Sequence, residues 1–160
     1  MIEAGLLAEL LTAKSQTLSV AESLTGGLIS HTLTNIPGSS AWFQGGIIVY
    51  SNHSKVEMLG VSRENLEKFG AVSPQVAKEM ADGVKAKFHT DFALSATGIA
   101  GPGGGSEEKP VGLVYLAVSC PQTTEVRKFL FSGNRLEIKQ QTCQTAVNLA
   151  LEFMRRDSIG

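Results

Sequence analysis

The chain has 160 residues, and its 14 Lys and Arg against 15 Asp and Glu give a formal net charge of -1 at pH 7. With 42% hydrophobic and 18% charged residues it has enough apolar material for a core, which excludes an intrinsically disordered chain. The near-neutral charge argues against a surface built for the phosphate backbone of nucleic acid. We expect one domain over residues 1–160 and no nucleic-acid partner.

No targeting segment is expected. Residues Met1–Gly5 include no basic region and no small-residue cleavage site, so they do not predict a secretory signal. Polar residues interrupt each apolar run well before the ~18 residues of a transmembrane helix. Cys120 and Cys143 can in principle be bridged, but two reduced thiols are the more common outcome. These features predict a cytoplasmic protein that does not associate with membranes.

Helical and strand patterns alternate along the chain. Leucines recur at helical spacing near the start, and Ser73-Pro74 is typical of a helix start, with Ser as the N-cap and Pro in the first helical position. Short apolar runs rich in β-branched residues indicate strands. In chain order we expect helix 2–15, strand 17–21, helix 25–35, strand 43–50, helix 52–60, a short helix from residue 62, helix 74–88, strands 91–97, 111–120 and 125–131, and helix 135–156.

Alternating strands and helices predict an α/β fold. Only Pro121 to Thr124 separate the last two strands, so that pair has to be antiparallel, because a parallel crossover requires about a dozen residues or more. The sheet is therefore predicted to be mixed. The glycine-rich loop Gly98–Pro110 follows a buried strand, which is where α/β folds place ligands.

The segment Ala21–Gly27 is a turn between a strand and a helix, with hydroxyl and backbone N–H groups aimed at one point. A helix N-terminus favours an anion, and Ser or Thr there can serve as cap, phosphate ligand or nucleophile. The Gly-Lys-Ser/Thr ending of a P-loop is missing. The local pattern supports helix capping by Ser23 or Thr25 and anion binding equally.

The segment Tyr50–Lys55 follows another strand and places a lysine near serines. Lys55 lies one helical turn after Ser51, and such a lysine can act as a general base if burial lowers its pKa from about 10.4. The same spacing suits a solvated helix, which is the more common outcome. Tyr50 can hydrogen-bond a substrate or cover the edge of the core.

Two further segments carry weaker signals. Peptide N–H groups of the glycine-rich loop can hold a phosphate or an oxyanion, although a solvent-exposed loop fits its composition as well. The turn Pro37–Trp42 can place Ser40 in a site, but a serine in a turn usually serves only the turn. No Gly-x-Gly-x-x-Gly opens a helix, and His31, His53 and His89 lack the spacing of zinc ligands, so neither a cofactor nor a metal is expected.

Five motifs in one register resemble a known family. They are Ala21–Gly27, Pro37–Phe43, Tyr50–Asn52, Gly70–Ser73 and Gly98–Gly104. Together they resemble the C-terminal domain of the CinA family of competence/damage-inducible proteins, a domain that also occurs alone in bacterial nicotinamide mononucleotide (NMN) deamidases. The resemblance spans about residues 5–155. It implies a three-layer α/β/α domain with a mixed, mostly parallel sheet, a homodimer or higher oligomer, and hydrolysis of NMN to nicotinic acid mononucleotide and ammonia in pyridine-nucleotide recycling.

The family's motif positions fall on Ser23, Ser40, Tyr50, Lys55 and Arg135. Amide hydrolysis requires a nucleophile, a base and donors for the developing oxyanion. With no metal motif, we predict Ser23 as the nucleophile and Lys55 as its base, with Ser40 as the rival nucleophile. Arg135 is predicted to bind the phosphate of the mononucleotide, although without the resemblance a surface ion pair would be preferred. The substrate is also expected to lie near Thr25, Gly26, Gly27, Thr97, Gly98 and Gly101.

Two non-enzymatic alternatives fit the same residues. A binding module would keep the anion site at Thr25–Gly27 without turnover, so ligand-dependent stabilisation without product would identify it. An interaction protein tied to competence or DNA damage would need a surface that the near-neutral charge does not indicate, and a salt-dependent gel shift would reveal it.

Overall fold

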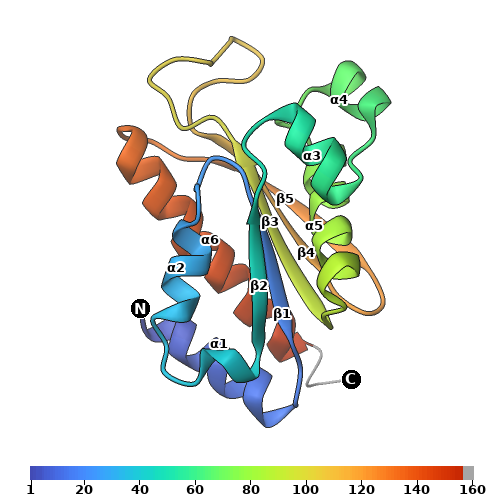
Figure 1. Cartoon of the computed structure of the whole chain (residues 1–160). Helices are drawn as coiled ribbons and strands as arrows, with labels where there is room; N and C mark the ends of the chain where they lie inside the picture. Colours follow the sequence, from blue (N-terminus) through green and yellow to red (C-terminus); the bar gives the residue numbers. More distant parts are fainter. Residues whose placement is uncertain (157–160) are drawn as a thin grey trace.

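The computed structural model describes residues 1–156, in which a five-stranded sheet is covered by helices on both faces (Figure 1). The helices are α1 (Ile2–Ala13), α2 (Leu28–Thr34), α3 (Asn52–Leu59), α4 (Arg63–Phe69), α5 (Pro74–Phe88) and α6 (Arg135–Arg156), with a short 3-10 helix η1 (Ser39–Ala41). The strands are β1 (Leu18–Glu22), β2 (Phe43–Ile48), β3 (Phe92–Gly98), β4 (Leu113–Ser119) and β5 (Thr124–Leu130).

The sheet has the order β2-β1-β3-β4-β5. Strand β1 pairs in parallel with both β2 and β3, whereas β4 is antiparallel to β3 and to β5. Every strand except β4 therefore runs in the same direction, which confirms the predicted mixed, mostly parallel sheet. From β1 the chain passes through α2 to one neighbour, β2, and then through α3, α4 and α5 to the other neighbour, β3. The carboxyl end of β1 is thus a topological switch point, where open α/β sheets bind ligands.

The two faces of the sheet differ in side-chain size. Leu18 and Val20 of β1 and Leu94 of β3 belong to the larger core cluster, which also contains buried residues of α1, α2 and α6. The opposite face carries small residues such as Ser95, so α5 can pack closely on it. The Ser95 hydroxyl accordingly donates to the Ala77 carbonyl of α5 at 2.6 Å. The three-layer α/β/α arrangement follows from this division (Figure 1).

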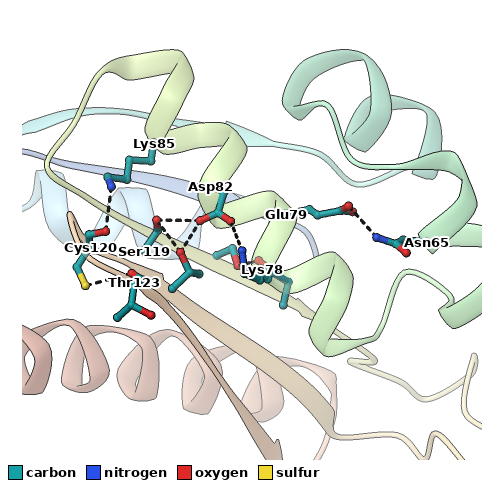
Figure 2. A network of polar contacts seen from close by, with 11 residues as sticks. Asn65, Lys78, Glu79, Asp82, Lys85, Ser119, Cys120 and Thr123 are labelled. Atoms are coloured by element: carbon teal, nitrogen blue, oxygen red, sulfur yellow. Dashed lines mark hydrogen bonds and ion pairs between the residues drawn. The ribbon is translucent and has the colours of Figure 1, made fainter.

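Polar contacts fasten α5 to the turn between β4 and β5 (Figure 2). The Asp82 carboxylate accepts hydrogen bonds from the hydroxyls of Ser119, at 2.9 Å, and Thr124. Lys85 Nζ donates to the Cys120 carbonyl at 3.0 Å. This network lies at the end of the sheet where β3 begins, because Ser119 pairs with Ala93. It therefore stabilises the scaffold at the end away from the switch point.

Most predicted elements are confirmed, and the main difference lies at α2. This helix begins at Leu28 instead of about Thr25, because Gly26 and Gly27 adopt positive φ angles of 59° and 104° that an α-helix cannot contain. Ser73 is the N-cap of α5, as predicted, and its Oγ accepts from Val76 N at 3.3 Å. Both cysteines are free. Across residues 1–156, no helix has the length and apolar character needed to cross a bilayer.

Two helical glycines give opposite predictions for the same substitution. A Cβ at Gly83 of α5 would lie 2.2 Å from the Leu59 carbonyl oxygen, whereas a Cβ at Gly5 of α1 would meet no atom within 4 Å. We expect Gly83→Ala to lower the free energy of unfolding by about 1–3 kcal/mol through overpacking. Gly5→Ala should raise it by about 0.5–1 kcal/mol, because alanine is the better helix former. Urea denaturation of both variants measures the difference, and equal stabilisation would contradict the close packing of α3 on α5.

Candidate active site

The candidate site lies at the carboxyl ends of β1, β2 and β3. Ser23 follows β1 directly, and its backbone N–H donates to the Ala96 carbonyl of β3 at 2.9 Å. The chain leaving β2 passes through Tyr50 and enters α3, which carries Lys55. Segments that are distant in sequence therefore meet at the switch point of the sheet.

Lys55 and Ser23 form a buried pair. Lys55 Nζ lies 3.1 Å from Ser23 Oγ, and the two residues are only 1% and 8% exposed. The same ammonium donates to the carbonyls of Val49, at 2.8 Å, and Tyr50, at 3.4 Å. The interpretation of Lys55 as a solvated helix residue is therefore wrong. Ser51 is not its partner either, because Ser51 caps α3, accepting from Ser54 N at 3.0 Å.

Burial changes the acidity of Lys55. Loss of hydration lowers the pKa of its ammonium from 10.5 to about 8. Within residues 1–156, no carboxylate pairs with this ammonium to restore the charged form. Near neutral pH a useful fraction of Lys55 is therefore uncharged and able to accept the proton of the Ser23 hydroxyl.

Glu22, immediately before Ser23, is a buried carboxylate to which the sequence analysis assigned no role. Its carboxylate is fully buried and accepts from the backbone N–H groups of Gly27 (3.1 Å), Ile29 (3.0 Å) and Ser30 (2.8 Å), and from Ser30 Oγ at 2.7 Å. This carboxylate occupies the N-terminus of α2, so within the predicted anion site at Thr25–Gly27 the N–H of Gly27 is already engaged, whereas that of Thr25 is not. The signal was available, because a carboxylate just before a helix suits the positive end of its dipole.

The turn after Ser23 contains polar groups that lack partners. Neither Ser23 nor Thr25 caps α2, whose N-cap is Gly27. In the part of the chain that the structure describes, the backbone N–H groups of Leu24 and Thr25 donate no hydrogen bond. The buried Thr25 Oγ1 also has no partner. Buried polar groups without a partner are rare in folded proteins.

Arg135 joins the glycine-rich loop to Tyr50. Its Nη1 donates to the Gly101 carbonyl at 2.7 Å, and its Nη2 donates to the Tyr50 hydroxyl at 3.0 Å. Tyr50 is 62% exposed, so it does not cover the core. Arg135 forms no ion pair with any described carboxylate, and the interpretation as a surface ion pair is wrong. Gly101 has a φ of +77°, and a Cβ there would lie 2.5 Å from Val111.

The other predicted loop positions mainly have structural contacts. The Thr97 hydroxyl donates to the Ala71 carbonyl at 2.9 Å, which ties the segment before α5 to the end of β3. Gly98 allows β3 and β4 to approach, since a Cβ there would lie 2.7 Å from the Leu113 carbonyl oxygen. A Cβ at Gly26 would lie 3.7 Å from the Nζ of Lys139, a cation one helical turn after Arg135 that the sequence analysis missed.

Ser40 is the predicted residue that the fold separates from the others. It is exposed and lies in η1, just before Trp42, whose carbonyl accepts from Leu18 N at the start of β1. Ser23 and Lys55 lie past the opposite ends of these strands. Within one chain, Ser40 therefore cannot replace Ser23 as the nucleophile that Lys55 activates.

A metal centre finds no support in the described residues. Residues 1–156 contain no group of three or more His, Cys, Asp or Glu side chains placed to hold an ion. The chemistry that the site offers is that of a serine and a lysine.

Comparison with known proteins identifies relatives across nearly the whole chain. The model of the CinA C-terminal domain matches residues 3–154. A putative competence-damage inducible protein of Moorella thermoacetica is 55% identical over 146 residues, which cover 91% of this chain and 35% of the relative. A CinA-like protein of Endomicrobium trichonymphae is 48% identical over 157 residues, covering 98% of this chain and 36% of the relative. The chain thus spans about a third of the length of these curated relatives.

Solved structures of CinA-related proteins have the same fold as this chain. The competence/damage inducible protein CihA from Agrobacterium tumefaciens has a TM-score of 0.88 and 43% identity, covering 94% of this chain and 95% of that one. A CinA superfamily protein from Enterobacter cloacae has a TM-score of 0.92 and 30% identity, covering 95% and 90%. With its fold and nearly its full length matched, this chain belongs to the family of the CinA C-terminal domain.

Proposed function

We propose that the protein is a metal-independent amidohydrolase that converts NMN to nicotinic acid mononucleotide and ammonia. The observation that carries the proposal is the buried 3.1 Å contact between Lys55 Nζ and Ser23 Oγ, in which the lysine has a lowered pKa. A serine beside an uncharged lysine is a means of acyl transfer that requires no metal. The choice of NMN rests on the resemblance to the stand-alone deamidases of the family.

In the proposed reaction, uncharged Lys55 accepts the Ser23 proton while Ser23 Oγ attacks the amide carbon of the substrate. The tetrahedral intermediate collapses as Lys55 returns the proton to the leaving nitrogen, which departs as ammonia. Ser23 is then esterified by the nicotinoyl group. A water molecule, deprotonated by Lys55, attacks this ester, and nicotinic acid mononucleotide leaves while Ser23 regains its proton.

The turn after Ser23 supplies groups for the oxyanion. The unpaired N–H groups of Leu24 and Thr25, together with the unpaired Thr25 hydroxyl, support a role in stabilising the negative oxygen of the intermediate. Gly26 and Gly27 provide the positive φ angles of this turn, and the Ile48 and Lys139 side chains lie beside them. We therefore propose Thr25 as a catalytic residue.

Arg135 and Tyr50 are proposed to bind the rest of the nucleotide. A guanidinium fork matches phosphate oxygens, and Arg135 is held at the site by neutral partners only, so its charge stays available. Gly101 and the end of β3, at Thr97 and Gly98, are proposed to line the adjoining side of the substrate site. A cytoplasmic homodimer or higher oligomer, without nucleic-acid or membrane partners, belongs to the same proposal.

One alternative is a nucleotide-binding module without turnover, which the unpaired donors after Ser23 and the uncompensated charge of Arg135 would serve equally well, whereas the names of the relatives refer only to competence and damage. Incubation with NMN and an ammonia assay separates the two functions. We expect ammonia release from NMN that persists with a chelator, and little release from the dinucleotide NAD. Ser23→Ala should lower kcat by several orders of magnitude, because the covalent step is lost. The matched control Ser40→Ala should affect kcat much less, whereas NMN-induced thermal stabilisation without product would favour the binding module.

The lowered pKa of Lys55 predicts a pH dependence. Since the base acts only when it is uncharged, kcat/KM should rise about tenfold per pH unit below the pKa of about 8 and level off above it. Lys55→Arg keeps the charge but holds its proton at any working pH, so it should be nearly as inactive as Lys55→Ala. Rates measured between pH 6.5 and 9.5 test this. Substantial turnover by Lys55→Arg would mean that the residue anchors the substrate and is not the base.

The unpaired Thr25 hydroxyl predicts opposite effects on stability and activity. Thr25→Val removes a buried polar group that has no partner in the free protein, so the free energy of unfolding should rise by about 1 kcal/mol. The same change should lower kcat by about 100-fold, since an oxyanion donor is lost. Thr25→Ser keeps the hydroxyl and should retain most of the rate. A Thr25→Val variant that is less stable but fully active would assign the hydroxyl a purely structural role.

A further inference from the structure

Consecutive backbone carbonyls at the end of α4 are held by side chains from three different segments. The carbonyls of Phe69–Ala71 accept, in order, from Lys109 Nζ, from Ser73 Oγ at 2.8 Å and from Thr97 Oγ1 at 2.9 Å. Lys109 belongs to the glycine-rich loop, and Thr97 to the end of β3. The motif Gly70–Ser73, to which the proposed function gives no role, is therefore where α4, β3 and the loop are joined.

Gly70 leaves room for the ammonium of Lys109. A Cβ at Gly70, where φ is +78°, would lie 3.0 Å from Lys109 Nζ. Lys109 is half-buried, and none of the ion pairs within residues 1–156 includes it. Its charge is directed at the Phe69 carbonyl, and a hydrogen bond from a charged donor is stronger than one from a neutral donor. This contact therefore ties the loop firmly to α4.

The loop is fastened at two points. Its Gly101 is buried, and the carbonyl of Gly101 accepts from Arg135 Nη1 at 2.7 Å, where α6 begins. Near the other end, Lys109 N donates to Ser106 Oγ at 3.0 Å and Ser106 N donates to the Lys109 carbonyl at 2.8 Å. Residues 102–108 between these points are exposed. The loop thus extends from α6 to α4 past the end of β3 (Figure 1).

The joined segments lie beside the candidate nucleophile. Thr97 follows Ala96, whose carbonyl accepts from Ser23 N at 2.9 Å. The hydrogen bonds of Lys55 Nζ, by contrast, go to Ser23 and to two carbonyls that follow β2. Displacement of the loop would therefore change the surroundings of a bound substrate and leave the pair of Ser23 and Lys55 in place.

We propose that Lys109 is a positioning residue that latches the glycine-rich loop beside the candidate active site. Through the Phe69 carbonyl it fixes one end of the loop, so that Gly101, and with it Arg135, stays where the substrate is bound. Lys109 does not contact the reacting groups, so its loss should weaken substrate binding more than it slows the chemical step. The kinetic part of the test rests on the proposed function, whereas the latch itself is measured without a substrate.

Cleavage by a glutamate-specific protease reports on the latch directly, because Glu107 and Glu108 lie in the exposed part of the loop. In the native full chain, Lys109→Met should be cleaved there about tenfold faster than the wild type, since local opening no longer breaks a charge-assisted hydrogen bond. Synthetic peptides spanning residues 103–112, with Lys or Met, correct for the intrinsic cleavage rate. Lys109→Arg keeps a charged donor and should restore most of the protection. Lys128→Met, at an exposed lysine on β5, is the matched control and should change nothing.

Steady-state ammonia release from NMN separates positioning from a general loss of structure. Lys109→Met should raise KM by about tenfold and change kcat by less than about threefold. The pH profile of kcat/KM should keep its inflection near the Lys55 pKa of about 8.

Unchanged protease resistance of Lys109→Met would overturn the proposal. Equally faster cleavage at sites outside the loop would overturn it as well, because Lys109 would then stabilise the whole fold. So would a loss of kcat at unchanged KM. A wild-type chain that releases no ammonia, but whose loop is protected through Lys109, would refute the proposed function alone.

Discussion

The burial of one ammonium without a counter-ion is the constraint on which the site depends. Lys55 is held by the Ser23 hydroxyl and two backbone carbonyls, and its pKa falls to about 8. This pKa shift lowers the free energy of unfolding by about 3 kcal/mol below pH 8. The cost is lost as the pH rises to 10.5, because the unfolded chain binds more protons across that interval. Packing elsewhere in the fold has to offset this loss of stability. The same desolvation lowers the pKa of Lys55 far enough for it to act as a base near neutral pH.

Two buried charged groups lie near the switch point of the sheet and have different kinds of hydrogen-bond partner. The ammonium of Lys55 is directed at carbonyl oxygens, whereas the carboxylate of Glu22 takes four donors at the start of α2. Since Glu22 already satisfies the positive end of α2, that helix has little left to offer a substrate anion. Arg135 of α6, by contrast, has only a carbonyl and a hydroxyl as partners, so its charge is not neutralised by a described carboxylate.

The chain matches the CinA C-terminal domain, and the curated relatives from Moorella thermoacetica and Endomicrobium trichonymphae are about three times longer. Ser23, Lys55, Tyr50 and Arg135 all lie within the matched residues 3–154 and meet in one chain. The chemistry proposed for this chain therefore requires no residue of a further domain, although Ser40 stands apart from these four.

Local pattern determined the order of the elements, the α/β class, the antiparallel pair at Pro121 to Thr124 and the cap at Ser73, because each depends on neighbouring residues and on loop length. The motifs also identified Ser23, Lys55 and Arg135 as candidates.

Only the tertiary structure decided which of these residues meet. Lys55 pairs with a serine 32 residues away and not with Ser51, and Lys139 faces Gly26 from the far end of the chain. The burial of Lys55 follows from the packing of α3 on the rest of the fold, which spacing along the chain does not contain. A side chain's pKa and its partners depend on the water and charges that distant segments remove or bring near, and the packing of the sheet and helices decides these.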